Sequence, residues 1–149
     1  MNKQRIQTGI LTIAIGLTLI AASYAAWTHT TIHTTGIISN LGVYSDIECT
    51  SPTNWIDWGT PAPDSIVERT VYLKNLGGFS ITLNLTTSNW NPTNANNHMQ
   101  ITWDREYYNL ASQSAIECTF TLTVFENVTS SDPKIGAFSS DIIITGTSA

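Results

Sequence analysis

The stretch IECTFTLTVF, Ile116 to Phe125, decides the fold of this chain. Apolar residues and Cys118 alternate along it with Glu117 and three threonines. Because successive side chains of a β-strand point to opposite faces of a sheet, this alternation predicts a strand with one face in a core and one in water. Threonine suits the wet face, since its β-branched side chain favours the pleated backbone while its hydroxyl bonds water.

Segments with the same two-residue period lie on both sides of this stretch. Strands are predicted over residues 30–39, 43–49, 55–59, 67–74, 79–87, 99–103 and about 137–145, in addition to 116–125. The turn at residues 75–78, Asn-Leu-Gly-Gly, has the length of a hairpin connection, so segments 67–74 and 79–87 are expected to pair. Residues 89–97, which include Pro92, are expected to form a loop. The pattern predicts a mainly β fold, a seven- to eight-stranded immunoglobulin-like sandwich.

A nearly charge-free apolar run, Gly9 to Trp27, precedes these segments. As a helix it would be about 28 Å long, which is close to the hydrocarbon thickness of a bilayer. We therefore expect a cytoplasmic basic tail over residues 1–8, a transmembrane helix or signal anchor over 9–27, and an extracellular β-sandwich domain over 28–149. The lipid bilayer is the first partner that the sequence predicts.

The charges around the run predict its orientation. Lys3 and Arg5 precede it, and the next basic residue is Arg69. Because basic residues stay on the cytoplasmic side, the N-terminus is expected in the cytoplasm and the C-terminal domain outside the cell. Tyr24 and Trp27 lie where an aromatic belt would meet the outer interface. The predicted location is the cell membrane, crossed once.

Cleavage of the run as a secretory signal peptide is the open alternative. The triplet Ser23-Tyr24-Ala25 has the small-x-small form that signal peptidase recognises. The run is longer than the usual signal core of about 7–15 residues, which favours retention. A pilin-type leader cut after Gly9 would need basic residues just before the glycine, where the chain has Gln7 and Thr8.

Composition limits the partners of the region after the run. The whole chain has 149 residues, and the part beyond residue 27 holds four basic and eleven acidic side chains. That length fits one domain, and the negative charge excludes nucleic acid as a partner. The chain contains 23 threonines and few charged residues, which suits exposed strands with a hydroxyl-rich surface.

The two cysteines, Cys49 and Cys118, predict a disulfide across the sandwich. By alternation, Cys49 lies with Val43 and Ile47 on the inner face of segment 43–49, and Cys118 lies on the inner face of 116–125. An oxidising extracellular compartment favours the bond. Closing a loop of about 70 residues would stabilise the fold by roughly 4 kcal/mol. Two buried free thiols are the alternative.

Two sequons predict a glycoprotein. Asn84-Leu85-Thr86 and Asn127-Val128-Thr129 have the N-x-Thr form that accepts N-linked glycan. Asn84 lies on the expected outer face of its strand, and Asn127 lies at a strand end. Both positions are therefore predicted glycosylation sites.

Three closely spaced pairs of ionisable residues are considered as metal or catalytic sites: His29 with His33, Asp46 with Glu48, and Asp104 with Glu106. In extended backbone the two histidines are about 13 Å apart, too far for one metal ion. We interpret the two carboxylate pairs as ordinary solvent-exposed faces of strands. The sequence shows no nucleophile–base pattern and no phosphate-binding loop. We therefore predict no enzyme, no cofactor and no metal. A metal-dependent hydrolase that uses His98, Asp104 and Glu106 is kept as an alternative, behind the two non-enzymatic functions given below.

Six segments carry a resemblance to a known family: GVYSDIECT (42–50), IDWGTPAP (56–63), RTVYLKNLGG (69–78), NWNPTNA (89–95), ITWD (101–104) and FSSDIIITG (138–146). They resemble small archaeal envelope proteins that have one N-terminal membrane helix and one immunoglobulin-like sandwich. The layout is distantly similar to the TasA/camelysin group of fibre-forming sandwiches. The family of archaeal envelope proteins usually has Pro-Gly in a turn where this chain has Pro63-Asp64.

The resemblance implies two functions. The first is a non-enzymatic, membrane-anchored cell-surface module with a structural or adhesive role in the envelope. The alternative is a secreted or assembled pilus or thread subunit that polymerises by β-strand donation, with identical subunits or other envelope proteins as partners. The expected donor segment is Ile32–Ser39, which carries the apolar residues Ile32, Ile37 and Ile38.

Overall fold

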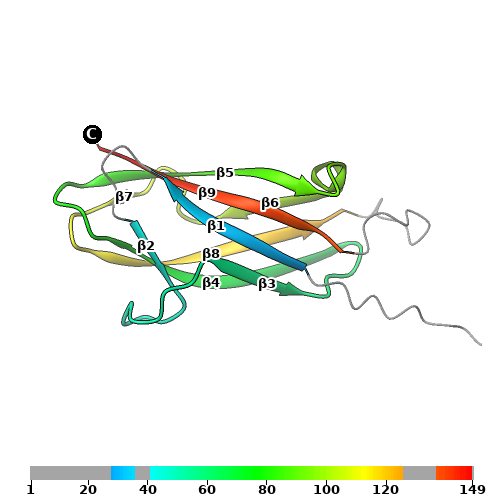
Figure 1. Ribbon diagram of the computed structural model, residues 1–149, viewed down its shortest axis with the longest axis horizontal. Coiled ribbons are helices and arrows are strands. Elements are labelled where there is room, and N and C mark those ends of the chain that lie inside the picture. The colour runs from blue at the N-terminus through cyan, green and yellow to red at the C-terminus, as the bar shows by residue number, and fades with distance from the viewer. Residues whose placement is uncertain (1–27, 36–40, 126–136, 149) are drawn as a thin grey trace, which may run out of the picture.

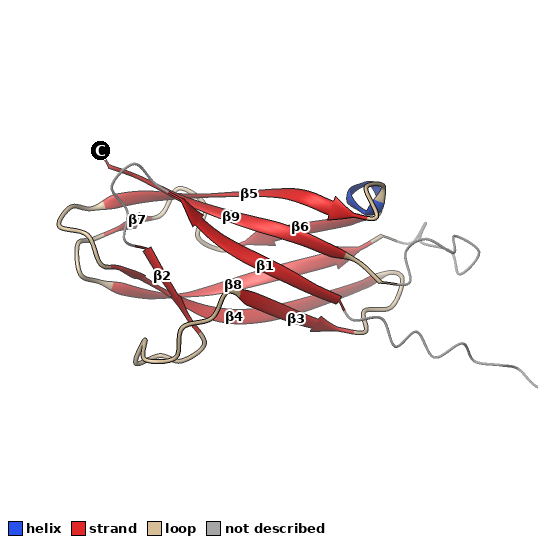
Figure 2. Ribbon diagram, viewed as in Figure 1, coloured by secondary structure: helices blue, strands red, loops and turns tan. Residues whose placement is uncertain are grey.

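The computed structural model describes residues 28–35, 41–125 and 137–148. These residues form two β-sheets packed face to face, with the strands running along the long axis of the molecule (Figures 1 and 2). We call the five-stranded sheet, ordered β3-β1-β9-β5-β7, sheet A, and the four-stranded sheet, ordered β2-β4-β8-β6, sheet B. The prediction of a mainly β, two-sheet sandwich is confirmed.

The elements follow one another in the order of Figure 1. Sheet A contains β1 (Thr28–Thr35), β3 (Trp55–Gly59), β5 (Ile81–Asn91), β7 (Asn109–Leu110) and β9 (Ser139–Ser148). Sheet B contains β2 (Leu41–Tyr44), β4 (Ser65–Asn75), β6 (Met99–Trp103) and β8 (Ala115–Val124). A single 3-10 turn, η1 (Ala95–Asn97), is the only helical element within the described ranges.

The strand IECTFTLTVF is β8, and it lies in the interior of sheet B. It pairs antiparallel with β4 from Ser65↔Val124 to Lys74↔Ala115, and with β6 on its other side. Its inner residues Cys118, Phe120 and Leu122 are fully buried, as the two-residue period predicts. Both sides of β8 are therefore hydrogen-bonded while one face fills the core.

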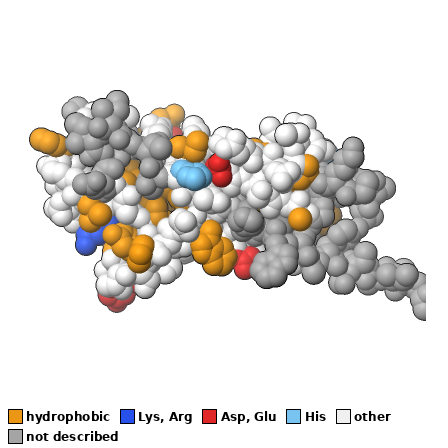
Figure 3. Space-filling view, in the orientation of Figure 1, with side chains coloured by type: hydrophobic (Ala, Val, Ile, Leu, Met, Phe, Trp, Pro, Cys, Tyr) orange, Lys and Arg blue, Asp and Glu red, His pale blue; other side chains and the backbone are white. Residues whose placement is uncertain are grey.

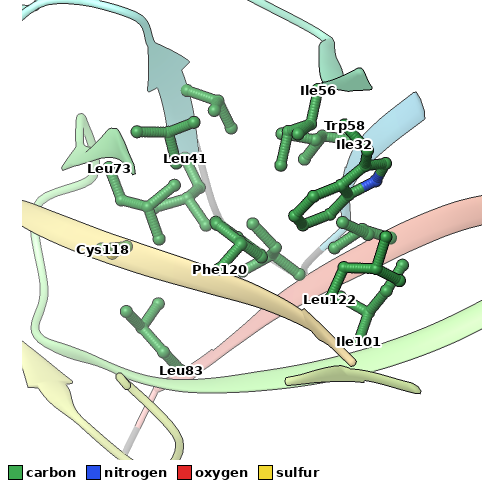
Figure 4. Packing of buried hydrophobic residues seen from close by; sticks show 14 of the residues in the cluster. Ile32, Leu41, Ile56, Trp58, Leu73, Leu83, Ile101, Cys118, Phe120 and Leu122 are labelled. Atoms are coloured by element: carbon green, nitrogen blue, oxygen red, sulfur yellow. The ribbon is translucent and has the colours of Figure 1, made fainter. Parts of the chain in front are cut away.

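The core lies between the two sheets. Figure 4 shows Phe120 and Leu122 of β8 at the centre of this cluster, with Trp58 and Ile32 of sheet A beside them. Trp58 is only 1% exposed and is the largest of the fully buried side chains. Burying an aliphatic or aromatic side chain of this kind contributes on the order of 1.5–3 kcal/mol.

The predicted strand number, seven to eight, is too low, since nine strands lie in the described ranges. Most of the difference comes from β7, a strand of two residues in a stretch expected to be loop. Two residues cannot show a period, and β7 exists because Ile81 and Thr82 of β5 pair with it. β5 also continues to Asn91, so the loop expected from residue 89 begins later than predicted.

The hairpin predicted between segments 67–74 and 79–87 is wrong. β4 belongs to sheet B and β5 to sheet A, so the connection crosses from one sheet to the other. The fully buried Asn75 holds this crossing, because its Nδ2 donates to the carbonyl oxygens of Phe79 at 2.8 Å and of Leu110 at 3.2 Å. Its Oδ1 accepts from the backbone N–H of Gly77 at 2.9 Å.

The strand predicted over residues 43–49 is wrong beyond Tyr44, where β2 ends. The Asp46 carboxylate accepts hydrogen bonds from the backbone N–H of Thr50 at 3.0 Å and of Ser51 at 2.6 Å, which closes a turn. A short acidic side chain that accepts hydrogen bonds from the backbone a few residues further along the chain offers those N–H groups an alternative to the hydrogen bonds of a sheet. Ile47 consequently points to solvent with 66% of its surface exposed.

The described ranges contain no helix long and apolar enough to cross a bilayer. The predicted membrane segment, residues 9–27, lies outside the described residues. So do the predicted orientation and interface residues Lys3, Arg5, Tyr24 and Trp27.

Candidate functional site

Strand β1 is the candidate site, because it directly follows the apolar run and contains half of the expected donor segment. It lies in the interior of sheet A, between β3 and β9 (Figure 1). It runs parallel to β9 over seven register pairs, His29↔Ser139 to Thr35↔Thr145, and antiparallel to β3. The backbone of β1 is thus hydrogen-bonded on both sides.

Among the described side chains of β1, those of Thr30 and Ile32 enter the core. Ile32 is 5% exposed and Thr30 is fully buried. The Thr30 hydroxyl accepts a hydrogen bond from the Trp58 indole Nε1 at 2.6 Å. This bond satisfies the single donor of a buried indole and joins β1 to β3 through side chains as well as backbone.

The outer side of β1 carries a polar cluster around Asp141 of β9. His33 Nε2 lies 3.3 Å from Asp141 Oδ1, and Asn89 Nδ2 of β5 donates to Asp141 Oδ2 at 2.6 Å. One carboxylate therefore contacts side chains from the strands on both sides of β9. Figure 3 views this face, where a histidine lies against an acidic side chain. His33 and Asn89 are exposed and Asp141 is half-buried, so the two contacts contribute only modestly to stability.

The expected donor segment, Ile32–Ser39, coincides only in part with a strand. Ile32 lies in β1, whereas Ile37 and Ile38 fall outside the described residues. In this single chain β1 completes the chain's own sheet. Whether it also completes the sheet of a second copy stays a prediction.

The two cysteines are free thiols in the structure, so the predicted Cys49–Cys118 disulfide is not formed. Cys118 is fully buried on β8, as predicted. Cys49 lies in the Asp46 turn with a φ of 53°, and not on the inner face of a strand. Burial, with a smaller effect of the nearby Asp104 charge, raises the pKa of the Cys118 thiol to about 12.

The sequons have different outcomes. Asn84 lies half-buried on the outer side of β5, opposite Thr145 of β9, so it is on the predicted face. Asn127 lies outside the described residues. Glycosylation at both positions stays a prediction.

The carboxylates Asp104 and Glu106 do not form a shared site: Asp104 bonds within sheet B, and Glu106 links sheet A to sheet B. Asp104 Oδ1 accepts from the backbone N–H of Thr119 in sheet B at 2.9 Å. Glu106 Oε2 accepts from the backbone N–H of Leu85 in sheet A at 3.2 Å, and from the Trp103 indole Nε1. The described residues contain no group of three or more histidine, cysteine or acidic side chains placed to hold a metal ion.

Sequence reasoning missed the side-chain contacts of β1. The alternation places Thr30 and Ile32 on one face, but no local signal pairs Thr30 with Trp58, which is 28 residues away. The contact between His33 and Asp141 spans the whole domain. The first contact requires the antiparallel pairing of β1 with β3, and the second requires the parallel pairing of β1 with β9; only the fold supplies either pairing.

The sequence matches no protein-family model and no curated protein. Among solved structures, the chain is similar to the ASH / PapD-like domain of human CEP192 (PapD-like domain 7). The TM-score is 0.41 and the identity 8%, over 75% of this chain and 86% of that one. A similarity at this level gives no residue roles and no function for this chain.

Proposed function

We propose that this protein is a non-enzymatic, membrane-anchored cell-surface module with a structural or adhesive role in the envelope. The observation that carries the proposal is the position of β1. The apolar run ends at Trp27, and β1 begins at Thr28 in the interior of sheet A. An anchor over residues 9–27 would therefore be joined to the domain with no linker between them.

Such a connection suits a domain that bears load. A pull on the anchor would act first on β1, whose backbone is bonded to β9 and to β3. The buried bond from Trp58 to Thr30 and the packing of Ile32 resist withdrawal of the strand. The load would then be shared by the whole sheet and not by a single edge strand.

The outer surfaces also support an extracellular location. On sheet B, Thr119, Thr121 and Thr123 of β8 lie on the outer face, with Thr70 and Thr102 opposite them on the neighbouring strands. Hydroxyls on β-branched side chains keep this face wet beside the charged side chains of Glu68 and Glu117, which lie on the same face. Few charged side chains are needed to hold this domain in solution beside a membrane surface.

Cell fractionation with protease shaving tests the proposal. We expect the intact 149-residue chain, with its initial residues, in the membrane fraction, and we expect protease added to intact cells to remove the C-terminal domain. The matched control replaces Lys3 and Arg5 with glutamine, which should reduce the fraction with the expected orientation. A chain that starts near Ala26 and is released into the medium would contradict the anchor.

A thread subunit joined by strand donation is the second candidate, favoured by the same strand. β1 is the first strand of the domain, and its departure would leave β3 and β9 each with an open edge. An identical β1 from a second copy would restore both ladders, since backbone hydrogen bonds supply most of the affinity in β-augmentation.

A disulfide lock distinguishes the two candidates. His33 and Ile143 are register partners on the outer face, so the pair His33→Cys and Ile143→Cys brings two thiols to adjacent strands. When oxidised within one chain, the lock should prevent donation of β1 but leave membrane attachment unchanged. Filaments assembled from subunits that carry the closed lock would contradict strand donation.

A further inference from the structure

A cavity of about 330 Å³ opens between β5 and β6, one strand from each sheet. Trp90, Ile101 and Phe125 contribute apolar surface to its lining, while Thr86, Asn96 and Gln100 contribute hydroxyl and amide groups. None of the lining residues within the described ranges is charged. No described residue that lines the cavity belongs to the Cys49 turn or to the β1 site.

The aromatic wall of the cavity is held in place. The Trp90 indole Nε1 donates to the Thr87 hydroxyl at 3.3 Å. The Trp90 ring stacks on Phe138, with 6.1 Å between the ring centroids and an interplanar angle of 23°. Its N–H is therefore occupied, and what Trp90 offers to a ligand is the apolar surface of a fixed ring.

The polar groups of the cavity are open to a ligand. Thr86, Asn96 and Gln100 are exposed, and no side-chain hydrogen bond engages them among the described residues. Each amide offers two donors and one acceptor, and the hydroxyl offers both functions. The cavity thus combines a rigid aromatic surface with several uncharged donors and acceptors.

We propose that this cavity is a binding site for a neutral pyranose sugar, such as the end of a surface glycan. A sugar ring presents a C–H face, which packs on an aromatic ring, and an edge of hydroxyls, which bond amides. A lipid tail would bury the amides without partners, and a charged ligand would lose hydration without a counter-charge. The volume lies at the lower end of ligand pockets, roughly 300–1,000 Å³, which suits a small ligand.

This inference rests on the cavity and does not depend on how the domain is attached to the cell. The full chain is purified in a detergent with a polyoxyethylene headgroup, because the headgroup of a sugar detergent would compete with the glycoside for the cavity. Neutral methyl glycosides are added while the indole N–H signal of Trp90 is followed by NMR, with Trp90→Phe used to assign that signal. We expect saturable shifts at Trp90 with a neutral glycoside, and weaker binding of the matching uronate.

A double variant and a matched control test the polar groups of the cavity without changing the core. The double variant Asn96→Ala with Gln100→Ala removes two exposed amides and should weaken binding on the order of tenfold. Asn109→Ala, an exposed amide on β7 outside the cavity, should bind as the parent chain does. Absence of shifts at tens of millimolar glycoside, equal binding by the double variant, or equal binding of the uronate would each overturn the proposal.

Discussion

Replacing Thr30 with valine tests the connection between β1 and the rest of sheet A. Valine has nearly the same shape as threonine, so packing is kept while the acceptor of the Trp58 indole is removed. Thr30 is 0% and Trp58 1% exposed, so water does not replace the lost partner. A buried donor left without a partner costs about 1–3 kcal/mol.

For a domain of this size, that loss corresponds to a fall in melting temperature of roughly 3–12 °C. Thermal unfolding of the full chain, followed by tryptophan fluorescence, measures it. Thr31→Val is the matched control, because Thr31 lies on the outer side of the same strand. A Thr30→Val chain that is no less stable than Thr31→Val would refute a contribution of the buried hydrogen bond.

A double-mutant cycle separates the hydrogen bond from the packing. Trp58→Phe removes the indole donor and some core volume, so it is destabilising by itself. Once the donor is gone, Thr30→Val leaves no unsatisfied group and should cost much less than in the parent chain. Equal costs in the two backgrounds would show that the bond contributes nothing.

Three further predictions concern the thiols, one turn and one close approach in the core. Because burial raises the pKa of the Cys118 thiol to about 12, iodoacetamide near pH 8 should label only Cys49 in the native chain and both thiols after unfolding, as counted by mass spectrometry. Hydrogen bonds from the turn backbone lower the pKa of Asp46 from 3.8 to about 2. The stability that this carboxylate adds is therefore present above about pH 4 and is lost as the pH falls toward 2. The difference in melting temperature between the parent chain and Asp46→Ala should shrink over that window. Gly146→Ala should destabilise by about 1–3 kcal/mol in urea unfolding, because the new Cβ would lie 2.7 Å from Ile81 Cδ1 and 3.3 Å from its Cβ.

Each of these has its own control. Cys49→Ser should leave no labelled thiol in the native chain, and labelling of both thiols at one rate would contradict the buried position of Cys118. A pH-independent difference for Asp46→Ala would show that the carboxylate is not what holds the turn. Gly78→Ala adds a Cβ with no atom within 4 Å, so it should leave stability unchanged.

The sequence predicted those strands whose inner and outer residues alternate over their whole length. β6 lies at 99–103 as expected, and β8 begins and ends within one residue of the prediction. Sequence patterns failed where a side chain competes with the ladder. The Asp46 carboxylate ends β2 early, and the buried Asn75 turns a predicted hairpin into a crossing between sheets. Local alternation carries no information about such bonds.

The sequence alone determined that this is a mainly β domain, and it predicts an anchor before that domain and the side on which the anchor places it. Tertiary structure decided which strands are neighbours: β1 beside β9, β4 and β5 in different sheets, and the two cysteines apart. The physical reason is that a period of two fixes which face of a strand is buried but not which strand lies next to it. Strand order depends on contacts between distant segments, such as Trp58 with Thr30 and Asp141 with His33.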